Sequence, residues 1–398
     1  MNKTMKHVLT FALALVMCLA LAAPAMAFTY TAIPGGSTSF QKYLVLESTA
    51  NVPDVTFSFT IEPGDAVPAE GVLPGPTGSN APTVSSAVFS NADNGSKSTT
   101  APTNESVQLN GQAYVAKTVN VDLAGVSFPE PGIYRYKITE NSGNVPGVTY
   151  NTTPIYLDVY VVDNTSGDQA PALSISGYVF HSSTTTSEVT QPDNRLSDKV
   201  TGIQNSYATY DLKVSKTVTG NKGSRDKYFA ITVTIFGNAG DTHQVEYTNG
   251  ADTTISANPN SATTCIPESG ATNPATLTIA AEASSLTQVF YIQHGQTFTI
   301  KDLPAGTKYT VTEAPEDYIP SYGVTTTGTE TGTVVPAGTS GSSYTSATGG
   351  LTADTTVAFT NHRAGVIATG VLLTVAPFVV LMLVGLAGAM VILKKKHS

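Results

Sequence analysis

Two segments of this 398-residue chain repeat one pattern, in which a turn with Pro and Gly leads into an alternating strand that ends in Thr-Glu. The copies are FPEPGIYRYKITE at 128–140 and LPAGTKYTVTE at 303–313. Each copy follows an apolar strand with a lysine and precedes a strand that ends in an asparagine: Lys42 and Asn205 around the first copy, Lys216 and Asn361 around the second. The Lys-to-Glu spacings are nearly equal. We therefore predict two tandem domains, each built on one Lys–Glu–Asn unit, with the boundary close to residue 206.

The chain between its two termini has the pattern of β structure. Apolar and polar residues alternate at 55–61, 134–138 and 309–311, whereas 155–162 is more continuously apolar. No segment outside the termini sustains the apolar period of an amphipathic helix, and Gly, Pro, Asn and Ser clusters interrupt the chain at short intervals. These features predict an all-β fold of the sandwich type.

The three residue types of the repeated unit permit a specific reaction. Burial of a lysine lowers its pKa and favours the neutral, nucleophilic amine. Burial raises the pKa of a glutamate, and the protonated acid can polarise the asparagine carbonyl and pass a proton to the departing ammonia. The product is a Lys–Asn isopeptide bond between the first and last strands, with Glu140 and Glu313 as the predicted catalysts. Because each bond forms once, we do not expect a turnover enzyme.

Both ends of the chain have the features of targeting segments. Lys3 and Lys6 precede an apolar run at 8–23, and Ala-Met-Ala at 25–27 fits signal peptidase, so 1–27 is predicted to be a signal peptide. At the other end, 371–393 carries no charge and is long enough for a transmembrane helix. The basic tail Lys394-Lys395-Lys396 then places the C-terminus on the cytoplasmic side.

The segment just before the apolar span resembles a Gram-positive cell-wall sorting signal. Its residues are Val366, Ile367, Ala368, Thr369 and Gly370. In such signals a sortase cysteine attacks the threonine carbonyl, releases the tail that begins with glycine, and transfers the acyl group to an amine. The familiar pattern is Leu-Pro-x-Thr-Gly, so valine and isoleucine here replace leucine and proline. We expect a dedicated sortase to be needed.

Composition excludes several classes of function. The chain has 20 basic and 29 acidic residues, and removal of both ends takes five lysines, which leaves a net charge of −14. A surface with this much negative charge should repel the phosphate backbone of nucleic acids. We therefore expect no nucleic-acid binding. Cys18 lies in the leader, which leaves Cys265 without a partner for an intrachain disulfide. The scattered histidines share no ligand spacing with Cys265, so we expect no metal and no other cofactor.

Several segments together resemble the streptococcal-type backbone pilins, which are shaft subunits of Gram-positive pili. These segments are 57–63, 131–140, 146–150, 359–361 and 369–377. The resemblance runs through nearly the whole mature chain. It implies two tandem immunoglobulin-like domains of the Cna B type, a pilin isopeptide-linkage sandwich at 28–206 and a second sandwich at 207–365, followed by the sorting signal at 366–398.

The resemblance also implies a role for each residue of the repeated unit. The expected cross-links are Lys42 to Asn205, with Glu140 as catalyst, and Lys216 to Asn361, with Glu313 as catalyst. In such pilins a separate lysine near the end of the first domain receives the acyl group of the next subunit. Lys199 occupies this position, one residue closer to the asparagine than the family spacing.

The expected partners follow from that polymer chemistry. Identical subunits would form a covalent head-to-tail polymer, in which Thr369 of one subunit is joined to Lys199 of another. A pilus sortase would catalyse this step, and tip or basal pilins would be further partners. We expect export to the cell surface, where the pilus is anchored to the cell wall. The sequence indicates no host ligand.

Two other classes of protein are alternatives to the shaft subunit. A wall-anchored adhesin or ancillary pilin would use the same domains without polymerising, and an acceptor lysine such as Lys199 separates the two alternatives. A secreted enzyme should show a nucleophile with its base, a set of perturbed acids or a metal site in a cleft. The sequence contains no such set of residues outside the repeated unit.

Overall fold

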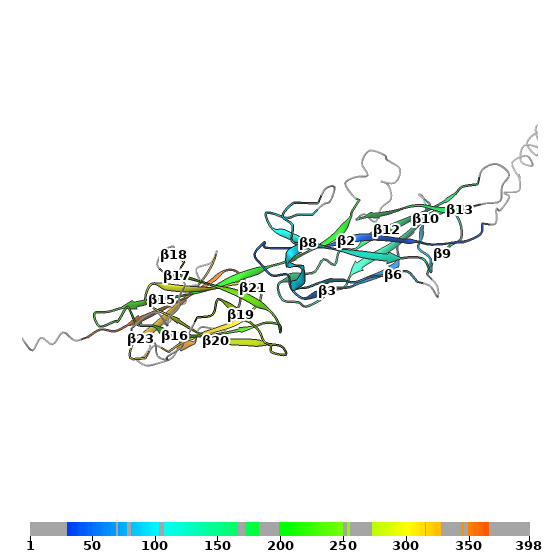
Figure 1. The fold of residues 1–398 in the computed structure, drawn as a ribbon. Coiled ribbons are helices and arrows are strands. Elements are labelled where there is room, and N and C mark those ends of the chain that lie inside the picture. The colour runs from blue at the N-terminus through cyan, green and yellow to red at the C-terminus, as the bar shows by residue number, and fades with distance from the viewer. Residues whose placement is uncertain are drawn as a thin grey trace, which may run out of the picture. The chain divides into compact units, whose positions relative to one another are not determined.

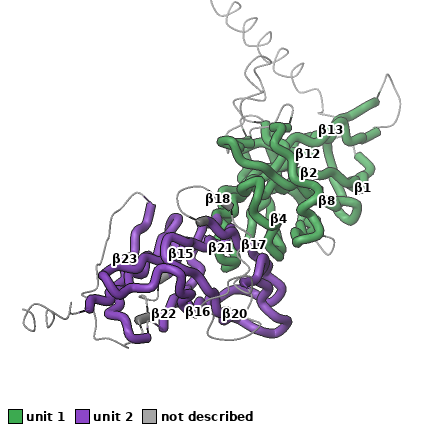
Figure 2. Tube along the Cα trace, turned by 60° about the vertical axis from the view of Figure 1, so that its left-hand side comes forward, with its two compact units in different colours: residues 1–208 green, residues 209–398 purple. Residues whose placement is uncertain are grey.

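The computed structural model divides into two compact units, residues 1–208 and 209–398, which Figure 2 shows in different colours. The structure describes residues 30–68, 71–77, 81–102, 107–165, 172–182, 199–249, 253–254, 273–314, 316–327, 344–345 and 349–365. The predicted signal peptide, the sorting signal with its transmembrane helix, and Cys265 lie outside these ranges. In the ranges themselves, no helix combines the length and the apolar character needed to cross a membrane.

Both units consist almost entirely of strands, which confirms the predicted all-β fold (Figure 1). The elements of unit 1 are β1 (Ile33–Pro34), β2 (Ser37–Leu46), β3 (Val55–Phe57), β4 (Phe59–Pro63), β5 (Val72–Pro74), β6 (Thr83–Val84), β7 (Ala87–Phe89), a 3₁₀ helix (Asn91–Ser96), β8 (Ala113–Asp122), β9 (Ser127–Phe128), β10 (Gly132–Glu140), β11 (Val148–Thr149), β12 (Ile155–Asp163), β13 (Leu173–His181) and β14 (Gly202–Tyr207). The elements of unit 2 are β15 (Thr209–Thr219), β16 (Phe229–Phe236), β17 (Thr242–Asn249), β18 (Thr253–Thr254), β19 (Thr276–Thr278), β20 (Ser285–Ile292), β21 (Gln296–Pro304), β22 (Lys308–Glu313), β23 (Ile319–Thr326), β24 (Tyr344–Thr345), β25 (Gly349–Gly350) and β26 (Thr355–His362).

Unit 1 is a sandwich of two main sheets. One sheet has the order β13-β12-β10-β4, with β5 also paired to β10, and the other has the order β11-β14-β2-β8-β6. Inward side chains of both sheets, such as Leu44, Val115, Tyr136 and Leu157, share one buried core. The alternation of the sequence explains this arrangement, because successive side chains of a strand face opposite sides.

Unit 2 repeats the two-sheet arrangement. Its larger sheet has the order β18-β17-β21-β15-β26-β23, and its smaller sheet has the order β20-β16-β22-β24. The core lies between these sheets, where the rings of Phe290 and Phe298 stack with their centroids 4.1 Å apart.

The first long strand and the last strand of each unit are parallel neighbours, in the same register. In unit 1, Lys42 of β2 lies opposite Ile203 of β14, two residues before Asn205. In unit 2, Lys216 of β15 lies opposite Phe359 of β26, again two residues before the asparagine. Since side chains two residues apart share a face, each lysine and each asparagine project from the same face of their sheet.

Candidate functional site

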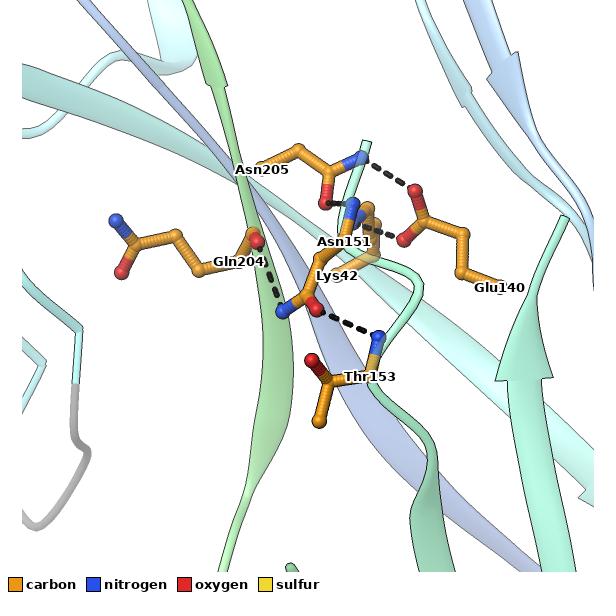
Figure 3. Close-up of polar contacts among 6 residues, drawn as sticks. All are labelled: Lys42, Glu140, Asn151, Thr153, Gln204 and Asn205. Carbon is orange, nitrogen blue, oxygen red and sulfur yellow. Dashed lines mark hydrogen bonds and ion pairs between the residues drawn. The ribbon is translucent and has the colours of Figure 1, made fainter. Parts of the chain in front are cut away.

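The triad of unit 1 joins its two sheets inside the core. Lys42 and Asn205 come from β2 and β14, and Glu140 is the last residue of β10 in the opposite sheet. All three are at most 2% exposed. Lys42 Nζ donates a hydrogen bond to Glu140 Oε2 at 2.5 Å, and Asn205 Nδ2 donates to Glu140 Oε1 (Figure 3). The structure therefore brings together the three side chains of the first predicted unit.

The triad of unit 2 has the same construction. Lys216 of β15 and Asn361 of β26 meet Glu313, which is the last residue of β22 in the smaller sheet. These side chains are at most 1% exposed. Lys216 Nζ donates to Glu313 Oε1, and Asn361 Nδ2 donates to the same oxygen at 2.9 Å. The three side chains of the second predicted unit are therefore also in direct contact inside the core.

An aromatic ring forms one wall of each lysine pocket. Lys42 Nζ lies 4.5 Å from the ring centre of Phe57, and Lys216 Nζ lies 4.2 Å from that of Phe229. These two phenylalanines lie outside the repeated Lys–Glu–Asn pattern, so that pattern does not indicate them as site residues. An apolar wall keeps water away from the amine, which strengthens the effect of burial on its charge.

Burial changes the protonation of both lysines. It lowers the pKa of Lys42 to about 8, although the glutamate beside it acts in the opposite direction. The pKa of Lys216 falls to about 8 for the same reasons. At pH 7 such a lysine is neutral in about one molecule in ten, against fewer than about one in a thousand for an ordinary lysine. Burial also raises the pKa of Glu313, although Lys216 and Asn361 oppose this shift.

The two triads differ at the asparagine carbonyl. Asn205 Oδ1 accepts a hydrogen bond of 3.0 Å from the backbone N–H of Asn151. Asn361 Oδ1 and Glu313 Oε2 are buried and have no hydrogen-bond partner among the described residues. Sequence reasoning missed Asn151, although it immediately follows the 146–150 segment that carried part of the family resemblance.

The predicted acceptor lysine takes no part in the hydrogen bonds of the unit 1 triad. Lys199 is exposed and pairs by its backbone with His181, the last residue of β13. It lines a surface groove of about 380 Å³ together with residues 39–41 of β2, 178–180 of β13 and 200–201. The predicted sorting residues, Val366 to Gly370, lie outside the described residues.

Unit 1 contains a second buried group of charged residues, which the sequence analysis did not predict. Arg135 of β10 forms a bidentate ion pair with Asp158 of β12, at 2.7 and 2.8 Å, and both side chains are buried. His181 Nε2 lies 3.1 Å from Asp158 Oδ2. Burial would raise the pKa of Asp158, but the hydrogen bonds from Arg135 and the nearby His181 ring outweigh it and lower the pKa. No three His, Cys, Asp or Glu residues of the described chain are grouped to hold a metal ion.

Known proteins similar to this chain are pilins. Residues 39–184 match the family described as Spy0128-like isopeptide containing domain, and residues 210–363 match a family described as a domain of unknown function (DUF7601). A pilin from Streptococcus pyogenes serotype M1 is 27% identical over 377 residues, which cover 92% of this chain and 93% of the relative.

Two solved structures of major pilins have a similar fold. The crystal structure of the major pilin from Streptococcus pyogenes has a TM-score of 0.57 at 24% identity, and the match covers 84% of this chain and 100% of that one. The major pilin T3.2 from the same species gives a TM-score of 0.52 at 19% identity, again over 84% of this chain and 100% of the other. The resemblance to Gram-positive major pilins, predicted from sequence motifs, is confirmed.

Proposed function

We propose that this chain, which is similar over nearly its whole length to Gram-positive major pilins, is the structural shaft subunit of a sortase-assembled surface pilus. Two intramolecular Lys–Asn isopeptide bonds stabilise the subunit, and Lys–Thr bonds join subunits into the polymer. The observation that carries the proposal is the pair of buried triads, each on the first long strand and last strand of a sandwich.

The geometry supports the first of these reactions in both units. The neutral lysine amine attacks Cγ of the asparagine, the carboxyl group moves a proton from the amine to the leaving nitrogen, and ammonia departs. Exclusion of water from the buried site strengthens every hydrogen bond to the developing charge. Each domain reacts once with itself, so the chain is a structural protein and not a turnover enzyme.

Such bonds suit a subunit that carries tension. Because each bond would join a pair of parallel neighbouring strands, force that enters one strand leaves through the other without extending the rest of that domain. Closing a loop of this length stabilises a domain by about 5 kcal/mol on the chain-entropy model. Unfolding under load is then blocked kinetically as well.

The exposed position of Lys199 supports the polymerisation step. Thr369 would form a thioester with the sortase cysteine, with loss of the tail from Gly370, and the Lys199 amine would then displace the sulfur to form an amide. A contact between two different surfaces of identical subunits does not close on itself, so it generates a filament. The proposed location is therefore a pilus on the surface of a Gram-positive cell, with the sortase and pilin subunits as partners.

The test is an immunoblot of cell-wall extract from cells that produce the chain together with its pilus sortase. We expect a ladder of high-mass bands with the wild-type chain and loss of the ladder with Lys199→Arg, because a guanidinium stays protonated and cannot attack. Lys213→Arg, at an exposed lysine of β15, is the matched control and should keep the ladder. A wild-type chain without a ladder contradicts the shaft function and favours the non-polymerising adhesin.

A further inference from the structure

The backbone N–H of Asn151 contacts the atom on which charge would develop when unit 1 forms its cross-link. This N–H donates to Asn205 Oδ1 at 3.0 Å, while Asn205 Nδ2 donates to Glu140 (Figure 3). Both ends of the carboxamide therefore have a partner. The reversed orientation would place the Nδ2 donor against the Asn151 donor, so the backbone N–H fixes which end of the amide faces the glutamate.

The chain holds Asn151 in place from both sides. Its side-chain Oδ1 accepts from the Thr153 N–H at 3.0 Å, and its Nδ2 donates to the Gln204 carbonyl of β14 at 3.4 Å (Figure 3). The first contact is an Asx turn, which sets the local backbone. The second ties this segment to the strand that carries Asn205. The side chain of Asn151 thus positions its own N–H.

The preceding turn anchors the same segment to the lysine pocket. The Val148 N–H donates a hydrogen bond to the Val145 carbonyl and closes a type II turn over Pro146 and Gly147. A type II turn requires a positive φ at its third residue, and Gly147 has a φ of 78°. The next aromatic residue, Tyr150, packs edge-on against Phe57 at 5.5 Å between ring centres. Phe57 is the wall of the Lys42 pocket, so the turn and the reacting amine share one packed cluster.

We propose that the backbone N–H of Asn151 is the catalytic donor that polarises the Asn205 carbonyl in unit 1, and that the Asn151 side chain is its positioning group. This inference rests on the proposed cross-linking reaction. The lone pair of neutral Lys42 Nζ forms a bond to Asn205 Cγ, and the carbonyl electron pair moves onto Oδ1, beside the Asn151 N–H.

The remaining atoms are accounted for by Glu140. Its carboxylate accepts one proton from Nζ and delivers it to Nδ2. The Cγ–Nδ2 bond then breaks, ammonia leaves, and the carbonyl re-forms as an amide whose nitrogen keeps one hydrogen. Asn151 and Asn205 also line an open groove of about 460 Å³, which gives the ammonia a route to solvent.

Unit 2 lacks this donor among its described residues. The strand beside Asn361 is β23, and it places Pro320, which has no N–H, directly opposite Asn361. In unit 1 the corresponding strand, β11, ends at Thr149, so the chain leaves the ladder before Asn151 and turns its N–H to the carboxamide. In the proposed reaction of unit 2, Glu313 would therefore have to polarise the Asn361 carbonyl.

The experiment follows bond formation during cell-free synthesis of residues 28–365. Samples are quenched in acid at timed intervals and digested, and mass spectrometry compares linked with unlinked peptides for each unit. Position 151 is tested with Asn151→Ala and with the matched replacement of residue 151 by lactic acid through a suppressor tRNA. The two variants carry the same methyl side chain and differ in the N–H alone. Unit 2 in the same molecule is the internal control.

We expect Asn151→Ala to slow the Lys42–Asn205 bond about tenfold, and the lactic acid replacement to slow it by about a further 10²-fold, the effect of losing one donor to a developing oxyanion. Unit 2 should keep its rate. Asn151→Asp retains the Oδ1 acceptor for Thr153 and should recover part of the rate. In an Asn205→Ala background, which cannot link, Asn151→Ala measures separately how much the loss of the Asn151 side-chain hydrogen bonds lowers the unfolding midpoint of unit 1.

Equal rates for the alanine and lactic acid variants overturn the inference. If the lactic acid variant fails to fold, the alanine and aspartate variants decide, because wild-type rates in both would also overturn it. Failure of the underlying function has a different signature, namely a wild-type chain in which neither unit yields a linked peptide.

Discussion

The two units contain the same reacting side chains in the same strand register, yet they surround the asparagine carbonyl differently. In unit 1 the short strand β11 ends early and frees a backbone N–H for Asn205 Oδ1. In unit 2 the long strand β23 continues past Asn361 with a proline opposite it. The comparison teaches that lysine, glutamate and asparagine keep the same arrangement in both units, whereas the donor to the asparagine carbonyl depends on how far a neighbouring strand extends beside it.

The first way to break this comparison is to remove the glutamates. Glu140→Ala and Glu313→Ala should each prevent the bond of their own unit, with a rate loss of at least about 10³-fold, because no other described side chain accepts the lysine proton. Intact-mass spectrometry of the purified ectodomain should read two ammonias below the sequence mass for the wild type and one below for each variant. A wild-type mass equal to the sequence mass would falsify the cross-links.

Removal of each bond should show that the two units gain equally from it. Asn205→Ala and Asn361→Ala each open a loop of similar length, so each unit should lose about 5 kcal/mol of unfolding free energy. Thermal unfolding and protease resistance of each unit provide the measurement. Unchanged midpoints in both variants would show that no covalent bond had joined the strands.

Loss of the buried Arg135–Asp158 ion pair should destabilise unit 1 and leave the stability of unit 2 unchanged. Asp158→Asn leaves Arg135 buried without its countercharge and should cost unit 1 about 3–5 kcal/mol, while the unfolding of unit 2 should not change. Among the described residues of unit 2, no arginine or aspartate is buried. Glu62→Gln, at the exposed Lys137–Glu62 pair, is the control and should cost less than about 1 kcal/mol. Equal losses of unfolding free energy from Asp158→Asn and Glu62→Gln would contradict the expectation that a buried ion pair costs more to break than an exposed one.

The pH dependence of bond formation gives the finest test of the difference. In unit 2 the reactive form needs a neutral Lys216 and a protonated Glu313. This form holds the same number of protons as the ion pair of charged Lys216 and ionised Glu313, so the balance between the two forms does not depend on pH. Its rate should be flat below pH 8 and fall about tenfold per pH unit above it, where the lysine pKa of about 8 is passed and the pair loses its shared proton. The timed digest, repeated at pH 7, 8, 9 and 10, measures this.

Unit 1 should behave in the opposite way on the alkaline side. Its carbonyl would be polarised by the Asn151 N–H and not by a protonated carboxyl group, so the form with neutral Lys42 can still react. The rate should therefore rise up to about pH 8, the pKa of Lys42, and then stay constant. Identical profiles for the two units would show that the N–H makes no difference to the chemistry.

The sequence by itself determined the fold class and the reacting residue types. Period-two alternation and the absence of helical periodicity fix strands, because a strand exposes alternate side chains to a core. The duplicated order of lysine, glutamate and asparagine also selected Lys42, Glu140 and Asn205, and the corresponding residues of unit 2. A lysine on an apolar strand is a local signal that needs no knowledge of its partners.

Only the tertiary structure decided which groups surround those residues. The contact between Asn151 and Asn205 depends on where β11 ends relative to β14, and the contact among Arg135, Asp158 and His181 depends on the register of β10, β12 and β13. The sequence pattern shows which face of a strand a residue occupies, but pairing between strands sets what lies opposite it. Register and strand ends are fixed by the sum of many weak contacts across a sheet, so no local pattern could have revealed these partners.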